Sequence, residues 1–385
     1  MLTVPDGYRE AMAAGNPIHI KMEYENGSVL TDADIDESSG VTLTDAFNPD
    51  TDIKMGKASC RQFQARIIIN DNTRYIRWVS DFDLYFGVED GEGGTIWIYF
   101  GKFTGQRPRN VTTLQAVDYT AYDQMRLFDD VADDWLDDVS FNKTVSWLLT
   151  NIGTQVGITV DTTQCLANPV DRSIANRFTN SSYTFRQLLE LLAETCGCYA
   201  RIGGTDMDKC ELAFFDLSSN PRIVTRDEIF YEEHADLYAG LRWDDFDEYT
   251  WDEADAMTWN EVTKYYKDAN AFEGVYIPKI DGGIIGRYPT NVKKGHIYSF
   301  NGNPVPKITS SAGVTNYVKP IYDRLQTLGG SLPMKVECLG DLVTQAGDVI
   351  QVELEEGIIE MPIFVKTTHW NGMLVDTYET TAPDA

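Results

Sequence analysis

The chain has 385 residues, of which 43% are hydrophobic, 12% aromatic and 24% charged; this composition is typical of folded proteins and excludes an intrinsically disordered chain. Its 60 acidic and 32 basic residues give a formal net charge of −28, which argues against a nucleic-acid site that works by neutralising phosphates. The same charge fits a conduit to which DNA must not adhere, or simply an acidic, soluble surface.

The length predicts two to four domains of about 100 to 200 residues each. The first residues lack the basic and apolar regions of a secretory signal, and no run of about 18 apolar residues predicts a membrane-spanning segment. Six cysteines are too sparse for a disulfide scaffold. We expect them to be reduced and mostly buried, in a protein that folds in the cytoplasm.

The N-terminal third has the alternation of β-strands. Residues 19–25 alternate before the turn Asn26-Gly27, which predicts a hairpin. Similar patterns predict strands at 62–70, 78–87 and 95–103.

Aromatic residues mark both faces of the strand at 95–103. Ile98 and Phe100 are predicted on one face, while Trp97 and Tyr99 lie on the other. Such a strand suits a small barrel whose outer wall packs on another domain or subunit. Trp97 and Tyr99 are therefore candidate subunit-contact residues.

A change of pattern follows at residues 112–130. Leu114 and Ala116 fit the end of a strand, whereas Met125, Phe128 and Val131 recur at helical spacing. Six aspartates between 129 and 138 are interpreted as the solvated face of a helix.

Residues 144–216 are predicted to form a compact α+β unit. An apolar helical stripe that begins at Val145 ends at Gly157. Thr184 and Gln187 have the spacing of a capping box at the start of a second helix, and residues 210–214 alternate like a strand.

Three tryptophans recur every eight residues, at Trp243, Trp251 and Trp259. Thr250 and Thr258 each precede a capping-box glutamate, which predicts short helical turns. The tryptophans are candidate contacts for a neighbouring subunit, or they pin an inserted loop to its own domain, and the second interpretation is favoured.

The last third repeats the mixture of strands and helix. Asn316 is predicted to cap a helix that ends at Gly329-Gly330, with Pro320 near its first turn. Residues 334–354 predict two strands across the turn at 346–348, and residues 362–368 and 373–380 predict two more.

No catalytic motif occurs in the chain. The motifs of serine hydrolases, zinc proteases and nucleotide-binding loops are absent, and the four histidines have no adjacent nucleophile. Cys196, Cys198, Cys210 and Cys165 are the one candidate thiolate set, but Cys-x-Cys is not the usual chelating spacing. We therefore predict no catalytic residue, no cofactor and no metal site.

Several segments resemble the baseplate-hub or tail-tip proteins of tailed bacteriophages, that is, the hub domains of tail-associated lysins and of late control protein D, without a lytic extension. They are GKFTG at 101–105, DYTAYDQMRLFD at 118–129, TFRQLLELLAETCGCYARI at 184–202, CELAFFDL at 210–217, GNPVP at 302–306 and CLGDLVTQAGDVIQV at 338–352.

The resemblance implies a β-rich α+β fold with two small tube-type β-barrels, each interrupted by an α/β or helical insertion. The implied domains are a first barrel at 1–122 that resumes at about 217–240, an inserted α+β domain at 123–216, the tryptophan-repeat insertion and start of the second barrel at 241–300, a helical insertion at 301–332, and the remainder of the second barrel at 333–385.

The function implied by the resemblance is structural, not enzymatic. A homotrimeric ring would join the sixfold tail tube to the threefold tip, contacting a tube or distal tail protein and a spike, fibre or tape-measure protein. DNA would pass through its channel during ejection without specific binding. The expected location is the virion, after assembly in the host cytoplasm. The alternatives are a tail-associated peptidase or peptidoglycan hydrolase, and a carbohydrate-binding receptor module that uses the tryptophan repeat.

Overall fold

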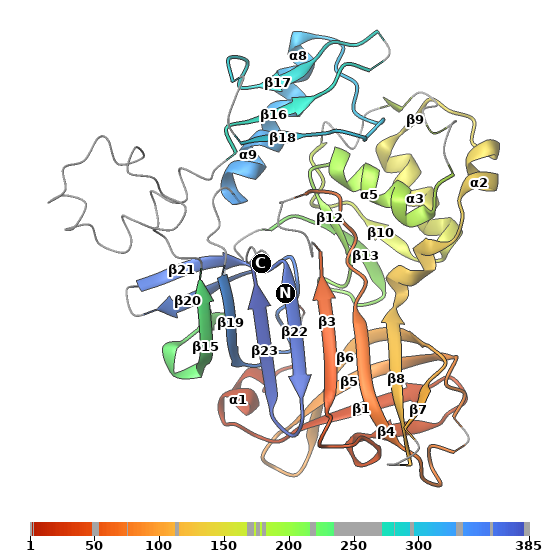
Figure 1. Ribbon diagram of the computed structural model, residues 1–385, viewed down its shortest axis with the longest axis vertical. Helices are drawn as coiled ribbons and strands as arrows, with labels where there is room; N and C mark the ends of the chain where they lie inside the picture. Colours follow the sequence, from red (N-terminus) through yellow and green to blue (C-terminus); the bar gives the residue numbers. More distant parts are fainter. Residues whose placement is uncertain are drawn as a thin grey trace, which may run out of the picture.

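The computed structural model describes residues 2, 4–47, 54–74, 76–111, 115–167, 173–174, 178, 182–215, 221–234, 272–280, 282–292, 296–328, 334–354 and 357–380. One large antiparallel sheet occupies the lower half of the molecule in Figure 1, and two smaller units that contain helices lie above it. The predicted β-rich α+β class is confirmed.

The large sheet combines strands from both ends of the chain. In order across the sheet its strands are β15 (Ile229–His234), β19 (Met334–Leu339), β23 (Leu374–Glu379), β22 (Val365–Trp370), β3 (Val41–Ala46), β4 (Gln62–Ile68), β8 (Ala116–Asp123), β6 (Thr95–Gly105), β5 (Asp81–Glu89), β1 (Ile18–Tyr24) and β2 (Val29–Thr31), with β7 (Arg109–Val111) paired to β8.

The N-terminal and C-terminal strands meet at the antiparallel pair β3 and β22, where Val41 lies opposite Trp370. The strands of both predicted barrels therefore pair within one sheet, and closure of each half into a barrel stays a prediction. The two halves also share a core, because Trp370 and Leu374 belong to the same buried cluster as Phe63 and Phe103.

Local alternation explains the individual strands. Phe63, Ala65 and Ile67 of β4 are buried while their neighbours face outward, and Ile98 and Phe100 of β6 are buried in the same way. The predicted hairpin at the start of the chain is present, since β1 pairs with β2. A short helix, α1 (Tyr8–Ala13), and a 3-10 turn, η1 (Asp32–Asp34), complete this part.

The two strands predicted on either side of residues 346–348 are present, but they belong to different sheets. β19 pairs with β15 and β23, whereas β20 (Val349–Leu354) pairs with β14 (Ile223–Val224) and β21 (Gly357–Pro362). The short turn η3 (Arg226–Glu228) connects β14 to β15. Residues 223–234 thus pair with C-terminal strands.

The predicted α+β unit surrounds a three-stranded sheet in the order β10-β13-β12. Its elements are η2 (Gln124–Asp129), α2 (Asp133–Asp138), β9 (Lys143–Thr144), α3 (Val145–Val156), β10 (Thr159–Asp161), β11 (Ser173–Ile174), α5 (Phe185–Thr195), β12 (Tyr199–Ile202) and β13 (Lys209–Ala213). Gly157 ends α3 at φ 83°, and the Thr184–Gln187 capping box starts α5, both as predicted.

The aspartate-rich segment is two short helices rather than one. η2 ends at Asp129 and α2 begins at Asp133. Five of the six aspartates are exposed. The sixth, Asp133, is half-buried and accepts hydrogen bonds from the Ser182 hydroxyl at 2.6 Å and the Tyr183 amide at 2.9 Å.

A third unit contains β16 (Gly274–Ile277), β17 (Gly286–Tyr288), β18 (Ile297–Ser299), α8 (Ser311–Gly313), the π-turn η5 (Val314–Val318) and α9 (Lys319–Leu328). Its helical segment is capped by Ser310, whose hydroxyl accepts from the Gly313 amide at 3.2 Å, and not by Asn316. Pro320 lies in the first turn of α9, directly after this π-turn.

Two buried arginines connect these units. Arg61 donates from Nε to Asp123 at 3.0 Å, at the point where β8 leads into η2. Arg201 of β12 contacts Glu211 at 2.9 Å and Asp348, next to β20, at 3.2 Å. Because such charges are stable in the interior only when paired and hydrogen-bonded, each arginine fixes the relative position of the elements that it joins.

Candidate functional site

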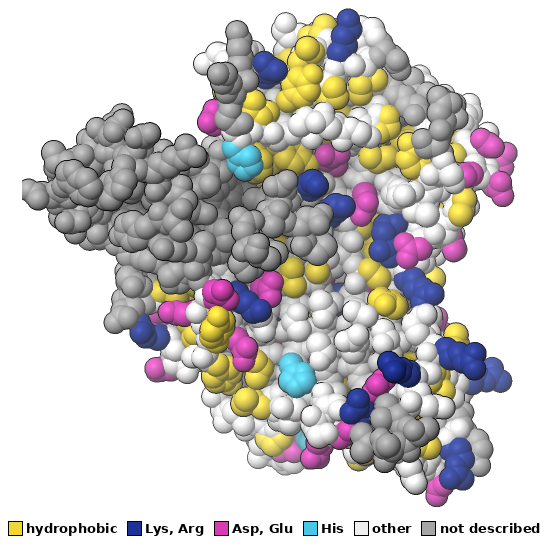
Figure 2. Space-filling model, viewed as in Figure 1, with side chains coloured by type: hydrophobic (Ala, Val, Ile, Leu, Met, Phe, Trp, Pro, Cys, Tyr) yellow, Lys and Arg dark blue, Asp and Glu magenta, His cyan; other side chains and the backbone are white. Residues whose placement is uncertain are grey.

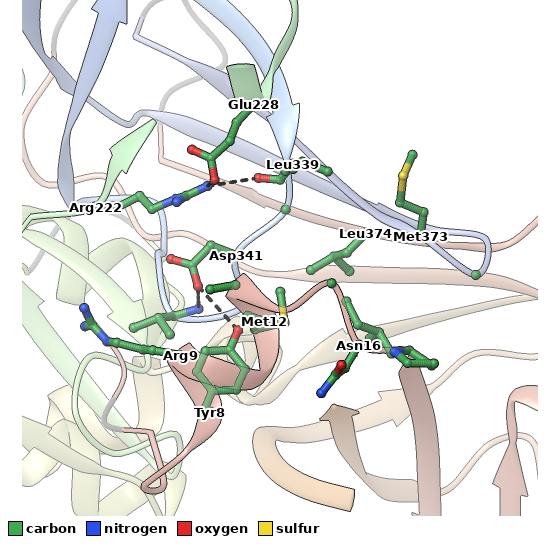
Figure 3. Close-up of a pocket in the computed structure, with 17 residues that line it drawn as sticks. Tyr8, Arg9, Met12, Asn16, Arg222, Glu228, Leu339, Asp341, Met373 and Leu374 are labelled. Carbon is green, nitrogen blue, oxygen red and sulfur yellow. Dashed lines mark hydrogen bonds and ion pairs between the residues drawn. The ribbon is translucent and has the colours of Figure 1, made fainter. Parts of the chain in front are cut away.

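A cavity of about 520 Å³ lies where α1 meets the turns at the ends of β19 and β22 (Figure 3). Four segments that are far apart in the sequence line it. The lining residues are Tyr8, Arg9, Met12, Ala13, Gly15, Asn16, Pro17, Ile18, Arg222, Glu228, Leu339, Gly340, Asp341, Val343, Gly372, Met373 and Leu374.

Tyr8 and Asp341 hold α1 against the C-terminal strands. The Tyr8 hydroxyl donates to Asp341 at 3.4 Å and accepts from the Leu342 amide at 3.2 Å. Burial and the nearby Asp341 carboxylate raise the pKa of Tyr8 well above its ordinary value. Tyr8 therefore stays a neutral anchor for α1 at any physiological pH.

Arg222 and Glu228 form the opposite wall of the cavity, as Figure 3 shows. The Arg222 guanidinium contacts Glu228 at 3.1 Å and donates to the Leu339 carbonyl at 3.3 Å. Its Nε atom is buried and has no hydrogen-bond partner among the described residues. The Arg222 guanidinium is thus held in place by partners of its own chain.

The two carboxylates of the cavity are already engaged. Asp341 accepts from the Val343 amide at 3.0 Å and the Thr344 hydroxyl at 2.9 Å, in addition to Tyr8. Glu228 is paired with Arg222. Both carboxylates are thus held by donors of their own chain.

The remaining walls are apolar and partly open to solvent. Met373 is 50% exposed and Leu339 is 38% exposed, and Met12 and Leu374 lie beside them. An apolar hollow with a few fixed polar groups binds by burying another surface. The geometry therefore supports recognition of a chain segment more than chemistry on a substrate.

The predicted contact residues of β6 lie elsewhere on the molecule. Trp97 and Tyr99 are half-buried on the face opposite Ile98, as expected from their alternation. The Lys21 ammonium lies 4.6 Å from the Trp97 ring centroid, and the Tyr99 hydroxyl donates to Asp208 at 2.7 Å. Both aromatic residues thus make contacts within their own chain, and a subunit-contact role stays a prediction.

Trp243, Trp251 and Trp259 lie outside the described residues, so their place in the fold is not given. Trp97 and Tyr99 do not line the cavity, and the residues that do line it were not predicted. Gly340 and Asp341 directly follow a strand, which is a pattern that could have indicated a functional turn. The residues opposite them come from positions 8–18 and 222–228, far away in the sequence.

The described histidines have structural contacts. His19 lies between Asp32 at 2.7 Å and Glu89 at 3.1 Å, and the hydrogen bond to Asp32, followed by that to Glu89, raises its pKa. His369 is 3.2 Å from the Thr42 hydroxyl, and the His296 ring stacks on Phe272.

All six cysteines are free thiols. Burial raises the pKa of the Cys210 thiol well above its ordinary value, so the sulfur stays protonated. Among the residues that the structure describes, no group of three or more His, Cys, Asp or Glu side chains has the arrangement of a metal site. In the same residues, no helix is long and apolar enough to cross a membrane.

Two solved structures share this fold over almost their entire length. The 43 kDa tail protein of prophage MuSo2 from Shewanella oneidensis has a TM-score of 0.51 and 12% identity, over 94% of this chain and 98% of that protein. The tail protein from Neisseria meningitidis MC58 has a TM-score of 0.54 and 11% identity, over 95% and 97% of the two chains.

No protein-family model matches the chain, and no curated protein matches it. The structural likenesses show that the chain has the fold of these tail proteins. The resemblance to phage tail proteins is confirmed at the level of the fold.

Proposed function

We propose that the chain is a structural subunit of a phage tail, located at the baseplate or tail tip. The observation that carries this proposal is the shared fold with two phage tail proteins, each aligned over 97% or more of its own length. The two matches also cover 94% and 95% of this chain.

In this proposal three copies form a ring that joins the sixfold tube to the threefold tip. The continuous sheet supports it, because the pairing of β3 with β22 joins the N-terminal and C-terminal halves into one wall. The net charge of −28 suits a channel through which DNA slides without binding. The domain limits at 122, 216, 240, 300 and 332 belong to the same proposal.

The cavity beside α1 would receive a segment of an adjoining tail protein, either the tube or distal tail protein on one side or a spike, fibre or tape-measure protein on the other. Its exposed Met373 and Leu339 supply apolar area for this contact. Trp97, Tyr99 and the tryptophans at 243, 251 and 259 remain proposed subunit contacts.

The first test is the mass of the assembled protein. Native mass spectrometry of the purified chain at high concentration should give three times the 43.4 kDa monomer mass. A species that stays monomeric at every concentration, even with the partner tail proteins added, would contradict the ring.

The enzymatic alternative predicts a different result. A peptidoglycan hydrolase or peptidase would clear a suspension of host cell walls, and replacing a cavity carboxylate such as Asp341 would abolish this activity. We propose that the chain is not an enzyme, because both cavity carboxylates are held by internal donors. Clearing of the suspension by the purified chain would refute that proposal.

A further inference from the structure

In the part of the chain that the structure describes, the large sheet ends at β15, whose outer edge has no paired strand. Among the described residues β15 pairs only with β19. Phe230 is 51% exposed and Tyr231 is 49% exposed. An open edge that carries exposed aromatic residues is a site where another strand pairs readily.

The exposed end of this strand is acidic. Glu232 and Glu233 are both exposed, and the nearest base on β19, Lys335, is already paired with Glu379 at 3.4 Å. Figure 2 shows hydrophobic, acidic and basic side chains together around β15, on the left of the molecule. We call the residues 230–233 the acidic edge.

A second open edge lies on the other side of the sheet. β7 pairs only with β8 among the described residues. Arg107 and Arg109 are exposed there, and neither forms an ion pair within the described part of the chain. Lysines and arginines gather on this lower right side in Figure 2. We call residues 107–111 the basic edge.

The charges of these two edges matter because the molecule as a whole is strongly acidic. At a net charge of −28, copies of this chain repel one another over most of their surface. Exposed arginines at the basic edge oppose this repulsion locally, and they favour an acidic open strand as their partner.

The strand lengths also agree. A register shift between Ile229 and Tyr231 interrupts β15, so four regular residues remain, from 231 to 234. β7 has three residues. Two short open strands of nearly equal length are able to pair without leaving a long exposed edge on either.

We propose that the acidic edge of one copy binds the basic edge of the next copy, with β15 and β7 side by side, so that the carboxylates of the acidic edge approach the guanidinium groups of the basic edge. Because the two surfaces differ, the contact is head to tail and repeats around the assembly until it closes into a ring. This inference rests on the proposed ring and names the surfaces that build it.

Charge reversal tests the contact. Glu232→Lys with Glu233→Lys reverses the acidic edge, and Arg107→Glu with Arg109→Glu reverses the basic edge. All four side chains are exposed, so the fold should tolerate the changes. Asp137→Lys with Asp138→Lys, on the exposed face of α2, is the matched control.

Native mass spectrometry over a concentration series supplies the readout. Each reversed edge should raise the concentration needed for assembly at least about tenfold, the control should leave it unchanged, and the quadruple variant with both edges reversed should assemble again. If the wild type forms its ring and neither reversal weakens it, the inference is overturned and the ring stands. If the wild type never assembles, the ring itself fails, and this contact with it.

Discussion

Arg61 and Asp123 form an ion pair whose side chains are only 3% and 0% exposed. Arg61 also donates to the Phe100 carbonyl at 2.9 Å, and Asp123 accepts from the Met125 amide at 3.1 Å. The pair therefore ties β6, β8 and η2 together at the exit from the large sheet. Burial raises the pKa of Asp123, and the adjacent Arg61 charge opposes this effect.

Replacing Asp123 with Ala should lower the free energy of unfolding by about 3 to 5 kcal/mol, because the Arg61 guanidinium would remain buried without its carboxylate. The midpoint of urea unfolding measures the change. Asp323→Ala removes an exposed pair with Lys319 and should cost no more than about 1 kcal/mol. If Asp123→Ala and Asp323→Ala lowered the free energy of unfolding equally, Arg61 would have found another partner in the first variant.

Residue-scale prediction from the sequence was best where the cause is local. Alternation placed Trp97 and Tyr99 opposite Ile98, and spacing placed the Thr184–Gln187 capping box. The Arg61–Asp123 pair was not predicted, since its partners are 62 positions apart and each is ordinary in its own segment. The cavity beside α1 was not predicted for the same reason, because segments far apart in the sequence line it.

At the scale of elements, Glu194 connects the end of α5 to β18 and to the loop that follows β18. Its carboxylate accepts from the Tyr298 hydroxyl at 2.8 Å and from Asn303 Nδ2 at 2.7 Å. Burial raises the pKa of Glu194 from its ordinary value of 4.5 to about 7, although both hydrogen bonds oppose the rise. The folded protein thus holds this proton more tightly than the unfolded chain does.

Because the pKa of Glu194 is higher in the folded protein than in the unfolded chain, stability falls as the pH rises. The contribution of Glu194 to stability is complete below pH 4.5 and is lost as the pH rises through about 7. It amounts to at most about 3 kcal/mol. Glu194→Gln should therefore make the urea midpoint depend less on pH between 5 and 8, with a gain over the wild type at pH 8. Identical pH profiles would refute the role of this carboxylate.

Strands and helices themselves were largely predictable, but their partners were not. β19 and β20 follow one another closely, yet they join different sheets, because β19 continues the large sheet beside β23. Likewise, the helical segment begins at Ser310 because a π-turn extends it backwards past Asn316. Such outcomes depend on contacts between distant segments, which local patterns do not contain.

At the scale of the whole molecule, one sheet carries three features on which the proposed assembly depends. The β3 and β22 pair joins its halves, the cavity beside α1 opens where the N-terminal helix meets the C-terminal turns, and the open strands β7 and β15 lie on opposite sides (Figure 1). A head-to-tail ring needs distinct surfaces of this kind on each subunit.

The central claim is that this chain is a structural subunit of a tail tip, and imaging of particles with a labelled copy of the chain tests it most directly. Electron microscopy should place the label at one end of the tail tube, in three copies per particle, around an open channel. Label spread along the whole tube, or tails that are complete without the chain, would contradict the account.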